Sequence, residues 1–308
     1  MKKWILSLVA SFMVFVLAAC GSNESTTEND GKIHVTTTIA QIEDIVINVG
    51  KDKVKTESLM GPGIDPHLYQ ASQGDIKKLQ GADIIFYNGL HLEGKMGEVL
   101  EKMAEDRPTV PVTRDIKEEQ LITDPANPGA HDPHVWFDIN LWKIAVDTVA
   151  EELAQVSPEH KEEFKQNAED YKQQLDDLYN ESVEKIEQIN ENSRVLVTAH
   201  DAFAYFGRSF GFEVEGLQGL STDSEYGLKD VQNIVGLLVD RDIKAVFIES
   251  SISEKSINAV VEGAKKKGHE VTIGGELFSD AMGEEGTEEG TYIGMFKHNI
   301  DTIVSSLK

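Results

Sequence analysis

The sequence predicts an α/β protein with two similar lobes, each a mainly parallel sheet flanked by helices, joined by one long helix. Short runs rich in β-branched residues alternate with amphipathic helical stretches over residues 33–156. The same alternation returns over residues 193–308. Between them, residues 157–192 contain one proline and no glycine, which indicates a long helix.

The first lobe is expected to cover residues 33–156. Its expected strands are KIHVTTT, KVKTESLM, DIIFYN and TVPVT. Its expected helices are QIEDIVINVG, QGDIKKLQGA, KMGEVLEKMAED and NLWKIAVDTVAEELAQV. Because strands and helices alternate, the sheet is predicted to be mainly parallel.

The linking helix is expected over residues 157–192, with Ser157 as N-cap and Pro158 in the first helical position. A helical hairpin is the alternative. The second lobe, residues 193–308, is expected to contain the strands RVLVTAH, IKAVFIES and HEVTIGG and the helices LKDVQNIVGLLVDRD and SINAVVEGAKKKG. This order resembles that of the first lobe, and a cleft between two lobes is a favoured place for a ligand.

Residues 1–20 are expected to be an export signal that ends at Cys20. Two lysines begin it, an apolar run too short to span a bilayer follows, and Leu-Ala-Ala-Cys closes it. This ending resembles the lipobox of bacterial lipoproteins, in which the cysteine is acylated; an incidental cysteine is the alternative. Cys20 is the only cysteine, so an intramolecular disulfide is impossible. Residues 21–32 are polar and aperiodic, as expected of a flexible tether.

The chain is strongly acidic, with 29 basic and 54 acidic residues and a formal net charge of −25. Such a surface repels the phosphates of nucleic acid, so no nucleic acid partner is expected. It also raises the local concentration of cations, although solubility alone would explain the same charge.

Four residues at or just past predicted strand ends are candidate metal ligands. They are His67 in GIDPHLYQ, His134 in HDPHVWFD, His200 at the end of RVLVTAH and Asp280 in GELFSDAMG. Open α/β sheets bind their ligands at this edge. Three imidazoles and one carboxylate suit a first-row divalent ion, whereas calcium prefers six or more oxygens.

Each candidate also has a structural explanation. The two Asp-Pro-His histidines could be capped loop residues, although two copies in one chain argue against coincidence, and the strand-end histidine could be a core residue. The carboxylates that compete with Asp280 are Glu276, Asp223 and Glu249. Asp65 and Asp132 could orient the histidines that follow them. His131 has i, i+3 spacing to the second motif but lies outside the repeated unit.

Several of these segments together resemble one family, the zinc- and manganese-binding solute-binding lipoproteins of bacterial ABC importers. The segments are DPHLYQ, DPHVWFD, TAHDAFAYFGRSFG, GLQGLSTDSE and the Asp280 loop. The resemblance covers nearly the whole chain. It implies two α/β lobes joined by a rigid helix, with a metal buried between them and bound by His67, His134, His200 and Asp280. The third ligand is His or Glu in this family.

The resemblance leaves the metal open between manganese and zinc. Zinc-importing members often carry a His-rich acidic loop before the second ligand, and RDIKEEQLITDPANPGA contains no histidine. That departure favours Mn²⁺. In the other direction, His200 makes the set rich in nitrogen, and zinc binds more tightly to most such sites. The expected ligand is Mn²⁺, with a zinc-specific receptor as the alternative.

The resemblance also implies a function and partners. The protein is expected to be lipid-anchored at the extracytoplasmic face of the cell membrane, to be a monomer, and to deliver its ion to the permease of an ABC transporter. A metallohydrolase is an alternative, but HExxH is absent and four protein ligands leave no position for a reactive water. An adhesin is a further alternative without repeats or a stalk to support it. No enzymatic activity is therefore expected.

Overall fold

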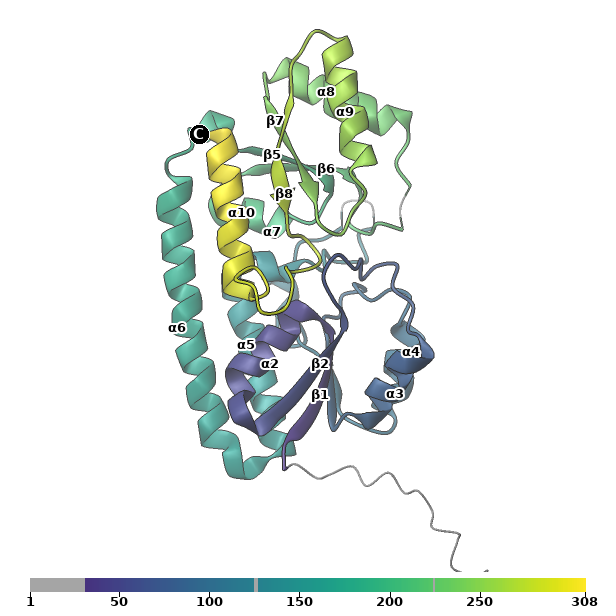
Figure 1. Cartoon of the computed structure of the whole chain (residues 1–308), viewed down its shortest axis with the longest axis vertical. Coiled ribbons are helices and arrows are strands. Elements are labelled where there is room, and N and C mark those ends of the chain that lie inside the picture. Colours follow the sequence, from purple (N-terminus) through teal and green to yellow (C-terminus); the bar gives the residue numbers. More distant parts are fainter. Residues whose placement is uncertain (1–30, 125–126, 224) are drawn as a thin grey trace, which may run out of the picture. The chain divides into compact units, whose positions relative to one another are not determined.

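The computed structural model describes residues 31–124, 127–223 and 225–308. Residues 33–308 form one compact unit, the folded body shown in Figure 1. The expected export signal with Cys20, and the expected tether up to residue 30, lie outside the described residues. No helix within the described ranges has both the length and the apolar character needed to cross a membrane.

The first lobe contains one parallel sheet with the strand order β2-β1-β3-β4. Its strands are β1 (Ile33–Ile39), β2 (Val54–Met60), β3 (Ile84–Tyr87) and β4 (Thr109–Pro111). Its helices are α2 (Ala40–Gly50), α3 (Gln73–Gly81) and α4 (Gly97–Ala104). Parallel neighbours need crossover connections, so all four carboxyl ends lie at the same edge of the sheet. The prediction of a parallel sheet for this lobe is confirmed.

Two helices follow this sheet, α5 (Ile139–Val156) and α6 (Lys161–Ile186). The second is continuous, so the hairpin alternative is wrong. It is shorter than the expected 157–192 because Pro158–His160 form a 3₁₀ turn and the helix ends at Ile186. Figure 1 shows α6 running alongside both sheet regions, with α5 and α2 packed on it below and α10 (Tyr292–Leu307) above.

The second lobe has two short parallel sheets where the sequence predicted one. One pairs β5 (Val195–His200) with β6 (Glu213–Gln218), and the other pairs β7 (Ala245–Glu249) with β8 (Thr272–Leu277). Strands β5 and β7 are neighbours, and at their carboxyl ends the Glu249 side chain accepts a hydrogen bond from the backbone N–H of His200. The helices of this lobe are α7 (Ala204–Phe210), α8 (Leu228–Asp240) and α9 (Lys255–Lys266). The short 3₁₀ helices outside it are η1 (Lys51–Lys53), η2 (Glu118–Gln120), η3 (Val135–Phe137), η4 (Pro158–His160) and η5 (Glu191–Ser193).

Two hydrophobic cores support these elements, and the boundary between them does not coincide with the expected boundary between the lobes. The smaller core lies between the second-lobe strands and α8 and α9, with Val197, Leu238 and Val260 among its members. The larger core fills the first lobe, continues along α6 and includes second-lobe residues such as Phe203 and Phe247, together with Met282 and Phe296 near the end of the chain. The segment that carries the last candidate ligand therefore packs on a core that both lobes share.

Candidate metal centre

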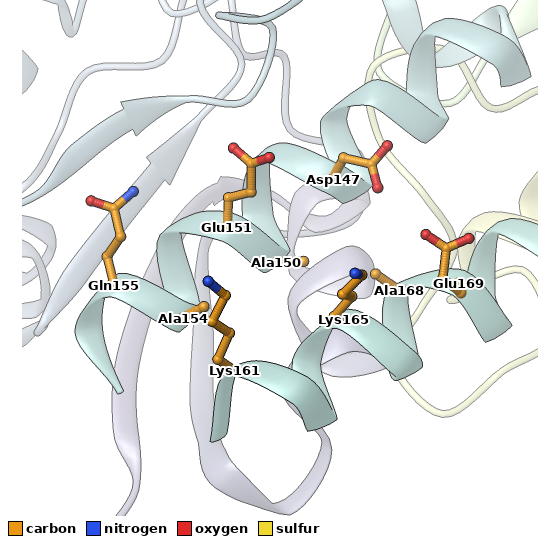
Figure 2. A pocket seen from close by; sticks show the side chains of 9 residues that line it. All are labelled: Asp147, Ala150, Glu151, Ala154, Gln155, Lys161, Lys165, Ala168 and Glu169. Carbon is orange, nitrogen blue, oxygen red and sulfur yellow. The ribbon is translucent and has the colours of Figure 1, made fainter. Parts of the chain in front are cut away.

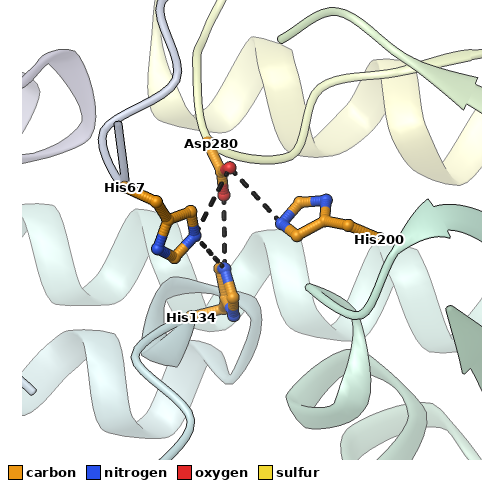
Figure 3. A group of neighbouring side chains, drawn as sticks. All are labelled: His67, His134, His200 and Asp280. Atoms are coloured by element: carbon orange, nitrogen blue, oxygen red, sulfur yellow. Dashed lines mark hydrogen bonds and ion pairs between the residues drawn. The ribbon is translucent and has the colours of Figure 1, made fainter. Parts of the chain in front are cut away.

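The structure brings the four candidate side chains together at one point (Figure 3). One donor atom from each of His67, His134, His200 and Asp280 lies within 4.8 Å of the other three. His67 follows β2, His134 precedes η3, His200 is the last residue of β5, and Asp280 follows β8. His67, His200 and Asp280 thus lie at or just past the carboxyl end of a strand, as the sequence predicted, whereas His134 lies in the segment between β4 and η3.

The distances within this cluster fit a single metal ion. Nε2 of His67 lies 3.3 Å from Nε2 of His134. Asp280 Oδ1 lies 3.3 Å from His134 Nε2, and Asp280 Oδ2 lies 3.3 Å from His200 Nε2 and 3.7 Å from His67 Nε2. A tetrahedron with metal–ligand bonds of about 2.0–2.2 Å has edges of about 3.3–3.6 Å. Each carboxylate oxygen faces different imidazoles, so Asp280 can bind through one oxygen or both.

The polar atoms at the centre are buried and unpartnered. Both carboxylate oxygens of Asp280 and Nε2 of His200 have no hydrogen-bond partner, although Asp280 is 1% exposed and His200 is fully buried. A buried carboxylate without a hydrogen bond is costly unless a cation compensates it. The chemistry and burial of this donor set therefore fit a divalent metal ion.

Two carboxylates orient two of the imidazoles. Asp132 Oδ1 accepts from the backbone N–H of His134 at 2.9 Å and lies 2.7 Å from its Nδ1. Glu249 accepts from the backbone N–H of His200 at 2.8 Å through Oε1 and lies 2.5 Å from its Nδ1 through Oε2. A carboxylate on Nδ1 fixes the tautomer and leaves Nε2 to face the ion. Glu249 was predicted only as a competing ligand, and its signal in the sequence is its position at the end of β7.

His67 is held in another way. Asp65 Oδ1 accepts from the backbone N–H of His67 at 2.9 Å, as Asp132 does for His134. Its other oxygen accepts a hydrogen bond from Thr222 Oγ1, in the second lobe, at 2.5 Å. Among the described residues, no carboxylate bonds to the ring Nδ1 of His67. This imidazole is therefore positioned through its backbone and a contact between lobes.

Electrostatics favour protonated rings at His134 and His200 when no ion is bound. Burial opposes the charge, but Asp132 and Asp280 together raise the pKa of His134 to about 9. Burial is likewise outweighed at His200, where Glu249 and Asp280 raise the pKa well above its usual value. An incoming cation must therefore displace protons from these rings.

The other two members of the cluster behave differently. Burial lowers the pKa of His67 to about 3, so its ring is neutral. At Asp280, burial would raise the pKa, but His200 and His134 outweigh it and hold the pKa of this carboxyl well below its usual value. The cluster thus offers one neutral imidazole and one ionised carboxylate at any ordinary pH.

The competing residues lie elsewhere. Glu276 is exposed on β8, and Asp223 is exposed and forms an ion pair with Lys95 at 2.9 Å. His131 is not in the cluster; it lines a cavity of about 200 Å³ that also borders His67 and Asp201. His131 therefore lies near the cluster without joining it, in agreement with its place outside the repeated Asp-Pro-His unit.

A larger groove, of about 480 Å³, lies between α5 and α6 and contains none of the four candidates (Figure 2). Its lining residues are Asp147, Ala150, Glu151, Ala154, Gln155, Lys161, Lys165, Ala168 and Glu169. Lysines and carboxylates alternate around an alanine floor, which is typical of the solvated seam between two antiparallel helices. The site of interest is therefore the smaller, buried cluster.

Comparisons with known proteins identify the family of this chain. A family model described as "Zinc-uptake complex component A periplasmic" (ZnuA) matches residues 35–306. The manganese-binding lipoprotein MntA of Bacillus subtilis is 56% identical over 309 residues, with 100% of both chains covered. The zinc-binding protein TroA of Treponema pallidum is 50% identical, with 90% of each chain covered. A solved structure of TroA superimposes with a TM-score of 0.87 and 49% identity, covering 90% of this chain and 99% of that one.

Proposed function

Because this chain belongs to the ZnuA family of periplasmic metal-uptake components, we propose that His67, His134, His200 and Asp280 hold the ion that it carries. The protein is a metal-binding solute receptor of an ABC importer and not an enzyme, because its relatives are substrate-binding components of such importers. The observation that carries the proposal is the buried Asp280 carboxylate, whose two unpartnered oxygens face three imidazoles. The ion is cargo, so the protein binds it outside the cytoplasm and releases it to the permease.

Mn²⁺ is the proposed cargo, with Zn²⁺ as the alternative. The relative with 56% identity is named for manganese and the relative with 50% identity for zinc, so names alone do not decide. Asp280 supports manganese because its two oxygens face different histidines, which permits five-coordination. Structural zinc sites are almost always four-coordinate and do not need the fifth contact. The preference for zinc in the general affinity order acts against this choice.

Calorimetric competition between Mn²⁺ and Zn²⁺ tests the site and the cargo together. The protein is titrated with each ion, and then with one ion in the presence of the other, in wild type and in Asp280→Ala. Loss of one carboxylate should weaken Mn²⁺ more than Zn²⁺, because only Mn²⁺ is proposed to use both oxygens. Equal losses for the two ions would contradict the manganese assignment, and no loss would remove Asp280 from the site.

We further propose a lipid anchor at Cys20, in residues outside the described structure. The relatives named as lipoproteins support it, and so does the single cysteine. Two acyl chains hold a protein on a membrane stably, whereas one does so only marginally. Cys20→Ala should release the protein into the medium with unchanged metal affinity; a variant that stays on membranes would contradict the anchor. The body is proposed to act as a monomer, which sedimentation of the released variant would measure.

A further inference from the structure

The loop that carries Asp280 is hydrogen-bonded to the first lobe. Nε2 of Gln41, on α2, donates to the backbone carbonyl of Asp280 at 3.1 Å. Nε1 of Trp136, on η3, donates to the backbone carbonyl of Ser279 at 3.1 Å. Gln41, Trp136 and Ser279 are all fully buried, so these bonds are shielded from water. Both donors lie more than 140 residues away along the chain.

Packing also connects this part of the chain with the first lobe. Met282, two residues beyond Asp280, and Tyr292 and Phe296 on α10 belong to the larger core, which fills the first lobe and reaches into the second. The hydroxyl of Tyr292 also donates to the backbone carbonyl of Trp136 at 2.6 Å. Toward the second lobe, the hydroxyls of Ser251 and Ser279 lie 3.3 Å apart, and Asn299 on α10 bonds to the backbone N–H and carbonyl of Phe278. Among the described hydrogen bonds, the backbone carbonyls of Ser279 and Asp280 accept from the first lobe only.

His200 has supports from the second lobe alone. Glu249 holds its backbone N–H and its ring, and Thr198 Oγ1 donates to its backbone carbonyl at 2.8 Å. Glu249 ends β7, whose residue Val246 belongs to the smaller core. Trp136, in contrast, packs its ring against His134 at 5.3 Å between centroids while it holds Ser279. The Trp136 side chain thus contacts one candidate ligand, His134, and the residue next to another, Ser279 beside Asp280.

We infer that Gln41 and Trp136 are positioning residues for Asp280, so that the first lobe fixes three of the four donors and the second lobe supplies His200 alone. This inference rests on the proposed function and deepens it. Although Asp280 follows the last strand of the second lobe, it stays with His67 and His134 when the lobes move against each other. Release of the ion then begins with separation from His200.

A double-mutant cycle in the full-length protein tests this inference. Gln41→Leu removes the donor with little change of volume, and Asp280→Ala removes the ligand. Asn167→Leu is the matched control, because Nδ2 of Asn167 donates to the carbonyl of Val49 at 2.9 Å, joining α6 to α2 away from the centre. Zn²⁺ affinity and dissociation rate are measured by chelator competition in each single variant and in Gln41→Leu with Asp280→Ala. Melting temperature without metal reports any general loss of stability.

Gln41→Leu is expected to lower Zn²⁺ affinity about tenfold in the wild-type background and to have no further effect in the Asp280→Ala background. Asn167→Leu should lower the melting temperature without lowering affinity. Trp136→Phe keeps an aromatic ring beside His134 but loses the indole N–H, so it should repeat the result of Gln41→Leu, and it serves as the test if that variant fails to fold. An equal loss in both backgrounds, or a loss no larger than that of the control, would overturn the inference while leaving the site in place. If Asp280→Ala itself changes nothing, the proposed site fails and the inference fails with it.

Discussion

The two Asp-Pro-His copies in the first lobe have the same local structure and different surroundings. In both copies, the aspartate two residues before the histidine accepts a hydrogen bond of 2.9 Å from the backbone N–H of that histidine. In the second copy the same oxygen of Asp132 also contacts the ring of His134, whereas in the first copy the other oxygen of Asp65 bonds to Thr222. One copy therefore controls the chemistry of an imidazole, and the other couples its histidine to the opposite lobe. The repeated motif pointed to both candidate ligands but not to these different surroundings.

The largest expected effect of this difference is on pH dependence. His134 has a raised pKa of about 9 and His67 a lowered one of about 3, so only the second copy contributes proton competition at neutral pH. Below a raised pKa the ring carries a proton that the ion must displace, so affinity rises with pH and levels off above that pKa. Affinity should fall about tenfold per pH unit for each displaced proton as the pH is lowered from about 9.

Calorimetry in buffers of different ionisation enthalpy measures these protons directly. His200, whose pKa is also raised, adds to the count. Ordinary histidines with a pKa near 6.5 would instead give a flat affinity above about pH 7. A flat profile would show that the carboxylates beside His134 and His200 do not raise the basicity of these rings.

The second effect concerns Asp132 itself. Asp132→Ala removes the carboxylate that fixes the His134 tautomer and should lower metal affinity by about 10–100-fold. It should also move the onset of the pH dependence to lower pH, because Asp132 helps to raise the pKa of His134. Metal titration at several pH values measures both. Unchanged affinity with an unchanged fold by circular dichroism would show that the ring needs no carboxylate.

The same substitution in the first copy should have a smaller effect. Asp65→Ala removes the hydrogen bonds that Asp65 accepts from the backbone N–H of His67 and from Thr222. The His67 ring loses no partner, because neither bond involves it. A net worth of about 0.5 kcal/mol for each of these two partly exposed hydrogen bonds corresponds to about fivefold in affinity. Its pH profile should match wild type. Parallel titration of Asp65→Ala and Asp132→Ala compares the two copies, and equal losses would mean that they do not differ in role.

The smallest effect should come from the contact between lobes alone. Thr222→Val keeps the shape of the side chain and removes its hydroxyl, which donates to Asp65. A bond of this kind, partly exposed, is worth about 0.5 kcal/mol or about twofold. The change should appear in the metal dissociation rate measured by stopped flow with a chelator, with the pH profile unaffected. A dissociation rate identical to that of the wild type would show that the hydrogen bond between Thr222 and Asp65 does not couple the first copy to the second lobe.

Much of this arrangement could be predicted because periodicity and strand ends are local properties. The strands of the first lobe follow from alternation. The four clustered side chains follow from the Asp-Pro-His repeat and from the positions of His200 at the end of RVLVTAH and Asp280 in GELFSDAMG. The start of α6 was misjudged by a few residues because Pro158 fits a 3₁₀ turn as well as a first helical turn. The second lobe was expected to have one sheet because periodicity predicts strands but not which strands pair.

Contacts between distant parts of the chain could not be predicted in this way. The strand-end position of Glu249 in FIES does not show that its carboxylate orients His200, because this contact joins residues 49 positions apart. Gln41 lies in an ordinary amphipathic helix, and its bond to the Asp280 carbonyl spans 239 residues. Such hydrogen bonds form only when the cores bring distant segments together, so the spacing of residues along the chain does not predict them.

The indole of Trp136, stacked edge to face on His134, also has an optical consequence. Excited indole is quenched by a protonated imidazole beside it, and quenched again by a paramagnetic ion but not by a closed-shell one. Only three tryptophans occur in the chain, and Trp136 and Trp142 in the folded body are both fully buried. Proton loss or Zn²⁺ binding should therefore raise the emission and Mn²⁺ binding should lower it again, so the protein carries its own fluorescent reporter of the state of the proposed site.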